Sequence, residues 1–216
     1  MTISESVYAV QKKYGGLGWP SLFVKLKFFA APFVQIIPLV PEEGTIIDLG
    51  CGYGILSNML GMLSPKRRVF GIDCDESKIR TADRGVTNVS FYCADITTSD
   101  IPQSDCIVII HVLHHLPSYA AQEEMLRACV GRLEPGGKLI ITEVDKLPRW
   151  KYAFSWIADH LLYPKDTITF RSQSDWLSLF SLFPLDVESI PMHQGVLFPH
   201  ITFVAKKSIL LRPSAQ

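Results

Sequence analysis

An acidic residue and three alternating glycines occupy residues 48–54 of the 216-residue chain, directly after a short apolar run. The glycines stand at every second position: Gly50, Gly52 and Gly54. Glycines let a backbone approach a ligand closely, and free N–H groups at the start of a following helix can bind it. A dinucleotide site would need G-x-G-x-x-G, but Ile55 breaks that spacing, and the carboxylate of Asp48 would repel a pyrophosphate. The pattern therefore favours a ligand that carries an ammonium group.

Two further carboxylates follow the next two apolar runs of the chain. Asp73 comes 25 residues after Asp48, at the end of the run 68–72, and a carboxylate there can accept hydrogen bonds from both hydroxyls of a ribose. Asp95 follows the third run, within reach of an adenine amine. Three acids at three successive strand ends, beside a glycine-rich turn, predict a nucleoside-binding site.

Short apolar runs that alternate with helical patterns must position these acids. We expect five strands, at residues 45–49, 68–72, 89–92, 105–110 and 138–142, and three helices, at residues 53–63, 76–84 and 119–133. Strands that alternate with helices form a parallel sheet that is covered on both faces. The carboxyl ends of such strands meet at one edge, where open α/β sheets bind their ligands.

The last third of the chain has a different pattern. Two helices are expected at residues 150–163 and 172–183, followed by two strands at residues 185–190 and 196–205. The connection between these strands is too short for the crossover that parallel neighbours require, so the two strands should pair in antiparallel fashion. We therefore predict an α/β fold whose parallel sheet is finished by an antiparallel edge hairpin.

Five segments, in this order and spacing, carry a resemblance to a known family: IDLGCGYG at residues 47–54, VFGID at 69–73, ADI at 94–96, VLHHL at 112–116 and LEPGGKL at 133–139. Over residues 43–145 the chain resembles the class I S-adenosylmethionine-dependent methyltransferases. The resemblance implies a Rossmann-like doubly wound sheet, mostly parallel, of seven strands with the last one antiparallel. It also implies that the cofactor is S-adenosylmethionine and that the protein transfers its methyl group.

The resemblance places nine residues around the cofactor: Asp48, Gly50, Cys51, Gly52, Asp73, Cys74, Asp95, Ile96 and His111. Within this set, Asp48 and the first two glycines would face the methionine part, and Asp73 would hold the ribose. Asp95 and Ile96 would contact the adenine. The backbone carbonyl of His111 would accept a hydrogen bond from the methionine amine.

Histidines and an acid that follow the fourth and fifth strands are the candidates for catalysis. An oxygen acceptor needs a base, and the imidazole of His114 or His115 suits neutral pH. Glu143, at the end of the fifth strand, is a candidate to orient the acceptor or a histidine. His200 is interpreted as a structural residue of the final hairpin. We expect no metal site, because three neighbouring histidines on one loop are weak support for one.

Residues 1–44 precede the first strand, and we expect them to form a helical lid. Residues 6–41 contain no acid, and apolar side chains recur there at helical spacing. Tyr14, Trp19 and Phe23 are the candidates to line the acceptor pocket. Plain packing of an apolar helix face onto the sheet would explain the same pattern.

Two lysines beside that apolar face, Lys25 and Lys27, also suit peripheral contact between residues 19–40 and lipid head groups. The aromatic segment at residues 150–163 adds further apolar surface. Both features favour an acceptor with a large apolar part, such as a lipid, a polyketide or a quinone-like ring.

Composition limits the remaining choices. Lys+Arg and Asp+Glu both number 21, which disfavours a nucleic-acid partner because such proteins are usually basic. No apolar run is long enough to cross a bilayer. The five cysteines form no C-x-x-C pair, which is typical of buried thiols in a reducing compartment. We expect a cytoplasmic protein, with peripheral membrane contact as described above, and one domain at residues 45–206 followed by a tail at residues 207–216.

Two other classes of function stay open. One is a protein that binds S-adenosylmethionine without catalysing transfer, although the intact loop and the three acids argue against this. The other is a dinucleotide-dependent oxidoreductase, against which Asp48 and Ile55 argue. The oligomeric state is not predicted.

Overall fold

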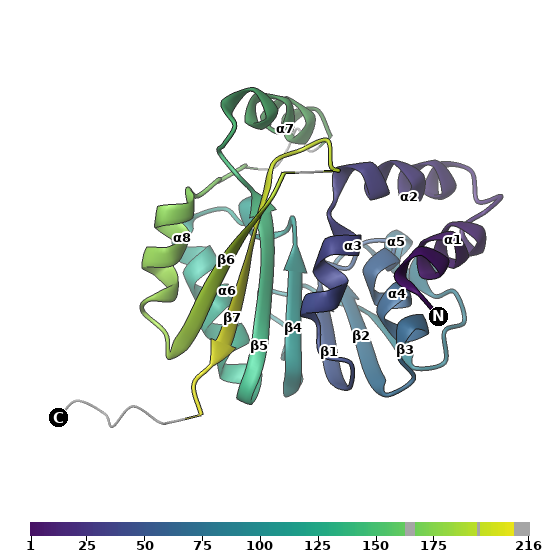
Figure 1. The fold of residues 1–216 in the computed structure, drawn as a ribbon, viewed down its shortest axis with the longest axis horizontal. Helices are drawn as coiled ribbons and strands as arrows, with labels where there is room; N and C mark the ends of the chain where they lie inside the picture. The colour runs from purple at the N-terminus through teal and green to yellow at the C-terminus, as the bar shows by residue number, and fades with distance from the viewer. Residues whose placement is uncertain (163–166, 194, 210–216) are drawn as a thin grey trace.

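A single sheet of seven strands forms the centre of the computed structural model, which describes residues 1–162, 167–193 and 195–209 (Figure 1). The strands are β1 (Gly44–Leu49), β2 (Arg67–Asp73), β3 (Val89–Cys93), β4 (Ser104–Ile110), β5 (Leu133–Val144), β6 (Leu185–Met192) and β7 (His200–Lys207). Their order across the sheet is β3-β2-β1-β4-β5-β7-β6. The chain therefore turns back at β1 and β4, and the carboxyl ends beside this reversal are where open α/β sheets bind ligands.

Pairing in the sheet confirms the predicted fold class. The strands from β3 to β5 are parallel neighbours, while β7 is antiparallel to both β5 and β6. The connection between β6 and β7 is short, which permits only antiparallel pairing. The expected seven-stranded sheet with its antiparallel last strand is thus present.

Helices cover both faces of this sheet. They are α1 (Ile3–Lys13), α2 (Trp19–Ala30), α3 (Phe33–Ile36), α4 (Ile55–Leu63), α5 (Glu76–Ala82), α6 (Tyr119–Arg132), α7 (Arg149–Leu162) and α8 (Gln173–Phe180), with short 3-10 helices η1 (Ile37–Leu39) and η2 (Leu113–His115). Alternate side chains of a strand point to opposite faces. Ile46 accordingly packs with the side chains of α1 to α4, whereas Ile47 packs with those of α6 and α8.

The start of β5 differs from the prediction. The strand was expected to begin at residue 138, but β5 begins at Leu133 and includes residues 133–137. Ser104 pairs with Leu133 and Cys106 with Lys138, so a bulge accommodates the extra residues between these pairs. Gly136, which lies in this segment, has a φ of 78°, in the left-handed region that favours glycine.

The N-terminal segment is two helices with a glycine-rich break between them. A capping box formed by Thr2 and Glu5 begins α1, and Gly18 with a φ of 64° precedes α2. Helix α1 packs against α4, whereas α2 lies at the end of the sheet where the parallel strands finish (Figure 1). The segment is therefore not one continuous helix, and its two parts present different faces to the domain.

The predicted domain limits lie close to the ends of the sheet. The first strand begins at Gly44 and the last ends at Lys207, against predicted limits of 45 and 206. Residues 210–216 of the predicted tail, and residue 163 of the predicted aromatic helix, lie outside the described residues. No single helix in the described ranges meets the length and hydropathy of a membrane span, although α2 together with residues 33–39 passes that test as a pair bent by 61°.

Candidate active site

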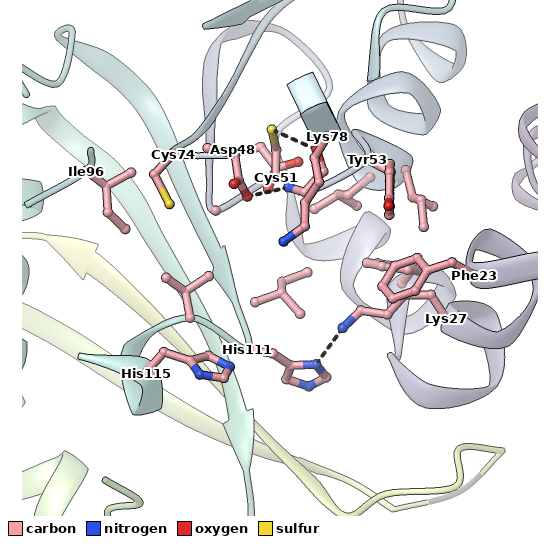
Figure 2. A pocket seen from close by; sticks show the side chains of 18 of the residues that line it. Phe23, Lys27, Asp48, Cys51, Tyr53, Cys74, Lys78, Ile96, His111 and His115 are labelled. Atoms are coloured by element: carbon pink, nitrogen blue, oxygen red, sulfur yellow. Dashed lines mark hydrogen bonds between the residues drawn. The ribbon is translucent and has the colours of Figure 1, made fainter. Parts of the chain in front are cut away.

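A cavity of about 370 Å³ opens where β1, β2 and β4 end (Figure 2). Its lining comes from the loop after β1, from the ends of β2 and β3, from the segment after β4 and from the inner face of α2. All nine residues predicted to bind the cofactor line this cavity. His111 lies on one side of it, and the other eight lie together on the opposite side: Asp48, Gly50, Cys51, Gly52, Asp73, Cys74, Asp95 and Ile96. The fold therefore brings the predicted cofactor set to one cavity.

The glycine-rich loop has a backbone that other residues would strain. Gly50 and Gly52 have φ values of 73° and 55°, in the left-handed region that favours glycine. A Cβ on Gly50 would lie 2.2 Å from Val112, so this position also needs a small residue for packing. A Cβ on Gly52 would meet nothing within 4 Å, so here the glycine leaves its backbone open to the cavity. Such an open backbone permits close approach of a ligand.

Asp48 is buried at the end of β1 and accepts a hydrogen bond of 2.5 Å from the Ser57 hydroxyl. Burial raises the pKa of Asp48 to about 6, and the nearby charge of Asp73 adds to this effect. Ionisation of Asp48 is therefore costly in the absence of a positive partner. A ligand with an ammonium group would supply that partner, so the carboxylate fits a cationic ligand.

Asp73 is held rigidly at the end of β2. Its carboxylate accepts hydrogen bonds from the backbone N–H of Gly52 at 2.8 Å and from that of Asp75 at 2.9 Å. These bonds tie the glycine-rich loop to the second strand. The carboxylate is thus pre-oriented in the cavity, which suits recognition of neighbouring hydroxyls.

Asp95 is more exposed than the other two acids. Its carboxylate accepts hydrogen bonds from the backbone N–H and the hydroxyl of Thr97, which lower its pKa. This turn keeps the side chain at the edge of the cavity, next to Ile96. An apolar residue beside a polar one suits the flat face and the amine edge of an adenine.

The other side of the cavity is basic and apolar. Lys27 of α2 and His111 after β4 lie there with Phe23, and His115 of η2 faces the same space (Figure 2). The Lys27 ammonium lies 3.4 Å from Nδ1 of His111. The acids that line the cavity stand at the ends of β1 to β3, with Lys78 of α5 on the same side. We call this side, which holds all three carboxylates, the acidic half, and the side with Lys27, His111 and His115 the basic half.

His111 has an unusual backbone and an unusual environment. Its φ of 56° is positive, which is uncommon for a residue with a side chain, and its ring stacks on that of His200 at 4.6 Å. Burial, reinforced by the charge of Lys27, holds the pKa of His111 well below its ordinary value. Its Nε2 has no hydrogen-bond partner among the residues that the structure describes. The imidazole is therefore neutral.

His114 and Glu143 form a buried pair behind the cavity. Nδ1 of His114 lies 2.5 Å from the carboxylate of Glu143, and the ring stacks on Phe170. The same carboxylate accepts hydrogen bonds from the backbone N–H groups of Val112 and Leu113. Neither His114 nor Glu143 lines the cavity, whereas His115 does. The geometry thus separates the three residues predicted for catalysis into one facing residue and one supporting pair.

The three side chains predicted for acceptor binding lie in different places. Phe23 lines the cavity and packs edge to face against Tyr53, with ring centroids 5.1 Å apart. Tyr14 is buried and donates a hydrogen bond to the carbonyl of Tyr53, and burial raises its pKa. Trp19 is exposed at the start of α2. Only Phe23 of the three lines the cavity.

Two basic residues of the cavity were not assigned to it from the sequence. Lys27 was expected at lipid head groups, but it lies inside, one helical turn after Phe23 on the same face of α2. That i, i+4 spacing was the available signal. Lys78 lines the cavity from α5. It lies in the first turn of this helix, and its ammonium is 3.7 Å from the carboxylate of Asp75, the N-cap residue of α5. No group of three or more possible metal ligands occurs in the described ranges.

His200 lies behind His111 on β7, where it is buried. Burial lowers its pKa to about 3, with Lys27 as the next cause, so the ring is neutral at physiological pH. Neither ring nitrogen has a partner within the described part of the chain. The stacked pair fixes the ring plane of His111 against the sheet.

Comparison with known proteins finds matches to methyltransferases. Residues 46–137 match a family model described as a methyltransferase domain. A ubiquinone biosynthesis O-methyltransferase of Coxiella burnetii is 31% identical over 107 residues, which cover 47% of this chain and 44% of that protein. A protein of the same name from Alkalilimnicola ehrlichii is 29% identical over 136 residues, covering 58% and 53%. The chain spans about half the length of these curated relatives.

Solved structures show the same fold. Human N-acetylserotonin methyltransferase in complex with SAM superposes with a TM-score of 0.66 at 16% identity, over 96% of this chain and 57% of that one. The N-methyltransferase NodS of Bradyrhizobium japonicum in complex with S-adenosyl-L-homocysteine superposes with a TM-score of 0.62 at 15% identity, over 94% of this chain and 98% of that one. The YcgJ protein of Bacillus subtilis superposes with a TM-score of 0.64 at 15% identity, over 82% of this chain and 97% of that one.

Proposed function

We propose that this chain, which belongs to the class I methyltransferases through its domain at residues 46–137, transfers a methyl group from S-adenosylmethionine to an oxygen of a small, largely apolar acceptor. The observation that carries the proposal is the division of one cavity into an acidic half and a basic half. A cationic donor and an electron-rich acceptor fit these halves, and the cavity holds them in contact.

The acidic half fits each part of the cofactor. The buried carboxylate of Asp48 suits the methionine ammonium, and the two backbone-bound oxygens of Asp73 suit the ribose hydroxyls. The open backbone at Gly52 leaves room for a ligand against the loop. When bound, S-adenosylmethionine supplies a methyl group on a positively charged sulfur, already activated for attack.

The basic half would prepare the acceptor. His115 faces the cavity and is the proposed base: its imidazole takes the proton of the acceptor hydroxyl while the oxygen attacks the methyl carbon and the carbon–sulfur bond breaks. Lys27 would stabilise the negative charge that develops on the oxygen. The low pKa of His111 makes it a poor base, so the role of base is assigned to His115 and not to His111.

His114 and Glu143 are proposed as positioning residues. Glu143 holds the backbone of Val112 and Leu113, and it fixes His114 by a hydrogen bond. This network sets the conformation of η2, which carries His115. The pair would therefore act on catalysis through the placement of the base.

The acceptor is proposed to have a large apolar part. Phe23, Phe33, Ile110 and Leu116 line the cavity near the basic residues. Two relatives are named ubiquinone biosynthesis O-methyltransferases, which supports a quinone-like ring, with a lipid or a polyketide as other acceptors of the same character.

Incubation of the purified protein with cell extract and cofactor carrying a labelled methyl group, followed by mass spectrometry, tests the proposal. We expect one or more apolar products that contain the label on oxygen. Calorimetry should show binding of S-adenosylhomocysteine and no binding of NAD. Cofactor binding without any labelled product would favour a binding protein, and binding of NAD alone would refute the methyltransferase proposal.

A further inference from the structure

Helix α2 presents a stripe of large apolar side chains to solvent. Trp19, Leu22, Leu26 and Phe29 follow one another at helical spacing, and each is between 49% and 68% exposed. The opposite face of the same helix packs into the domain, where Val24 is fully buried. Exposed apolar stripes of this length are unusual on a protein that has no partner.

Helix α7 carries a second stripe. Trp150, Phe154, Ile157 and Leu161 lie on one face at spacings of three and four residues, and each is between 56% and 78% exposed. Ser155, on the inner face, is buried. Neither stripe is used by the proposed chemistry.

A loop before β7 joins the two helices into one surface. The Lys151 ammonium of α7 donates hydrogen bonds to the carbonyls of His193 and Val196, and the backbone N–H of Leu197 donates to the carbonyl of Phe29 in α2. Leu197 is itself exposed. Both helices lie at the end of the molecule where the parallel strands finish (Figure 1).

We propose that the exposed stripes of α2 and α7, together with Leu197, form a membrane-docking face that binds an anionic lipid bilayer. The face holds nine of the twenty large apolar side chains that are exposed in the described ranges. Tryptophan and other aromatic side chains favour the interface between head groups and acyl chains, where an apolar ring and a polar edge are both satisfied.

Charge favours a bilayer over a second copy of the chain. Lys25 is exposed within the α2 stripe, Arg149 is exposed at the start of α7, and residues 6–41 contain no acid. Two copies of α2 in contact would bring like charges together, because this part of the chain contains no acid. Anionic head groups would instead pair with them.

The position of the face adds a consequence that rests on the proposed function. Phe23 and Lys27 line the cavity from the inner side of α2, whose outer side is the docking face. An acceptor dissolved in the bilayer would then need to pass only one helix to reach the basic half of the cavity.

Flotation of the full chain with vesicles tests the docking face without any acceptor. We expect the protein to float with vesicles of phosphatidylcholine and phosphatidylglycerol, and more weakly with phosphatidylcholine alone. The double variants Leu22→Gln/Phe29→Gln and Trp150→Gln/Phe154→Gln should each reduce the bound fraction about tenfold. Lys25→Glu should reduce binding to the anionic vesicles alone.

The matched control is Leu177→Gln/Leu182→Gln, which removes two exposed leucines from α8 and the turn after it. It should float like the unchanged protein. Equal flotation of all variants, or no flotation of the unchanged protein, would overturn the proposal. If the unchanged protein forms dimers and does not bind vesicles, and the docking-face variants are monomers, the face would be assigned to a second copy of the chain instead.

Affinity for S-adenosylhomocysteine is measured for every variant. It should stay unchanged, which shows that the variants are folded. If the unchanged protein does not bind S-adenosylhomocysteine, the proposed function is refuted, whereas the result of the vesicle experiment still decides the docking face.

Discussion

The two halves of the cavity are built in different ways. The acidic half comes from one continuous part of the chain, in which Asp48, Asp73 and Asp95 each follow a strand of the same parallel sheet. The basic half joins α2 to the segment after β4, so that Lys27 and His111 meet although 84 residues separate them. Strand order alone assembles the first half, whereas the second depends on how a separate helix docks.

This difference predicts that the two halves can be damaged independently. Changes in the acidic half should weaken binding of the cofactor, and changes in the basic half should slow transfer while cofactor binding is kept. Four variants test this separation.

His115→Ala should have the largest effect. Loss of the proposed base should slow methyl transfer about a hundredfold or more, since general bases contribute roughly 10²–10⁴-fold. The dissociation constant for S-adenosylhomocysteine should change less than about twofold. His160→Ala, which changes an exposed histidine on α7, is the control. Full activity of the His115 variant would show that the base lies elsewhere or is not needed.

Asp73→Ala should weaken binding of S-adenosylhomocysteine by about 10- to 100-fold in calorimetry. The variant loses the ribose partner and releases the N–H groups of Gly52 and Asp75, and charge-assisted hydrogen bonds contribute roughly 1.5–3 kcal/mol. Asp95→Ala is the comparison, with a smaller expected loss because its carboxylate is exposed and bound to Thr97. Unchanged affinity in the Asp73 variant would contradict its place in the site.

Asp48→Asn should stabilise the free protein while it weakens cofactor binding. The pKa of Asp48 is about 6 in the folded state and 3.8 ordinarily, so its contribution to stability is present below pH 4 and is lost as the pH rises through 6. In urea unfolding, the free energy of unfolding of the variant should therefore exceed that of the unchanged protein by up to about 3 kcal/mol at pH 8 and should differ little from it near pH 4. The same gain at both pH values would mean that burial of the charge is not its source.

Lys27→Met should have the smallest effect of the four. The kcat for a soluble acceptor should fall about three- to tenfold, because an exposed or half-buried charge contributes on the order of 1 kcal/mol. Removal of the ammonium should also raise the pKa of His111, which proton NMR of the ring can follow. Lys25→Met, on the outer face of the same helix, should leave both quantities unchanged. A loss of cofactor affinity in the Lys27 variant would break the division of the cavity.

The sequence predicted the acidic half well, because each of its residues is local to a recognisable element. A glycine-rich turn, a strand and an acid follow one another within a few residues, and parallel strands bring such ends to one edge. The parallel sheet followed from the same alternation of strands and helices, and the antiparallel pairing of β6 with β7 followed from the short connection between them.

The basic half was predicted less well, and α2 shows why. Tyr14, Trp19 and Phe23 were treated as one helical segment, but glycines at residues 15, 16 and 18 end α1 and restart the chain as α2. Helical periodicity does not continue across such a break, which separates Tyr14 from Phe23. Trp19 lies in the same helix as Phe23 but is exposed at its start, so of the three only Phe23 lines the cavity. The placement of Lys27 depended on the same docking.

The chain by itself determined the parallel sheet, the glycine-rich loop and the three acids, because these depend on local pattern and on strand direction. Only the tertiary structure decided that His115 faces the cavity while His114 pairs with Glu143 behind it. The two histidines are neighbours with the same chemistry, and their sequence positions do not differ in any signal. The turn of η2 and its hydrogen bonds to Glu143 distinguish them, and these arise only when β4 and β5 lie side by side.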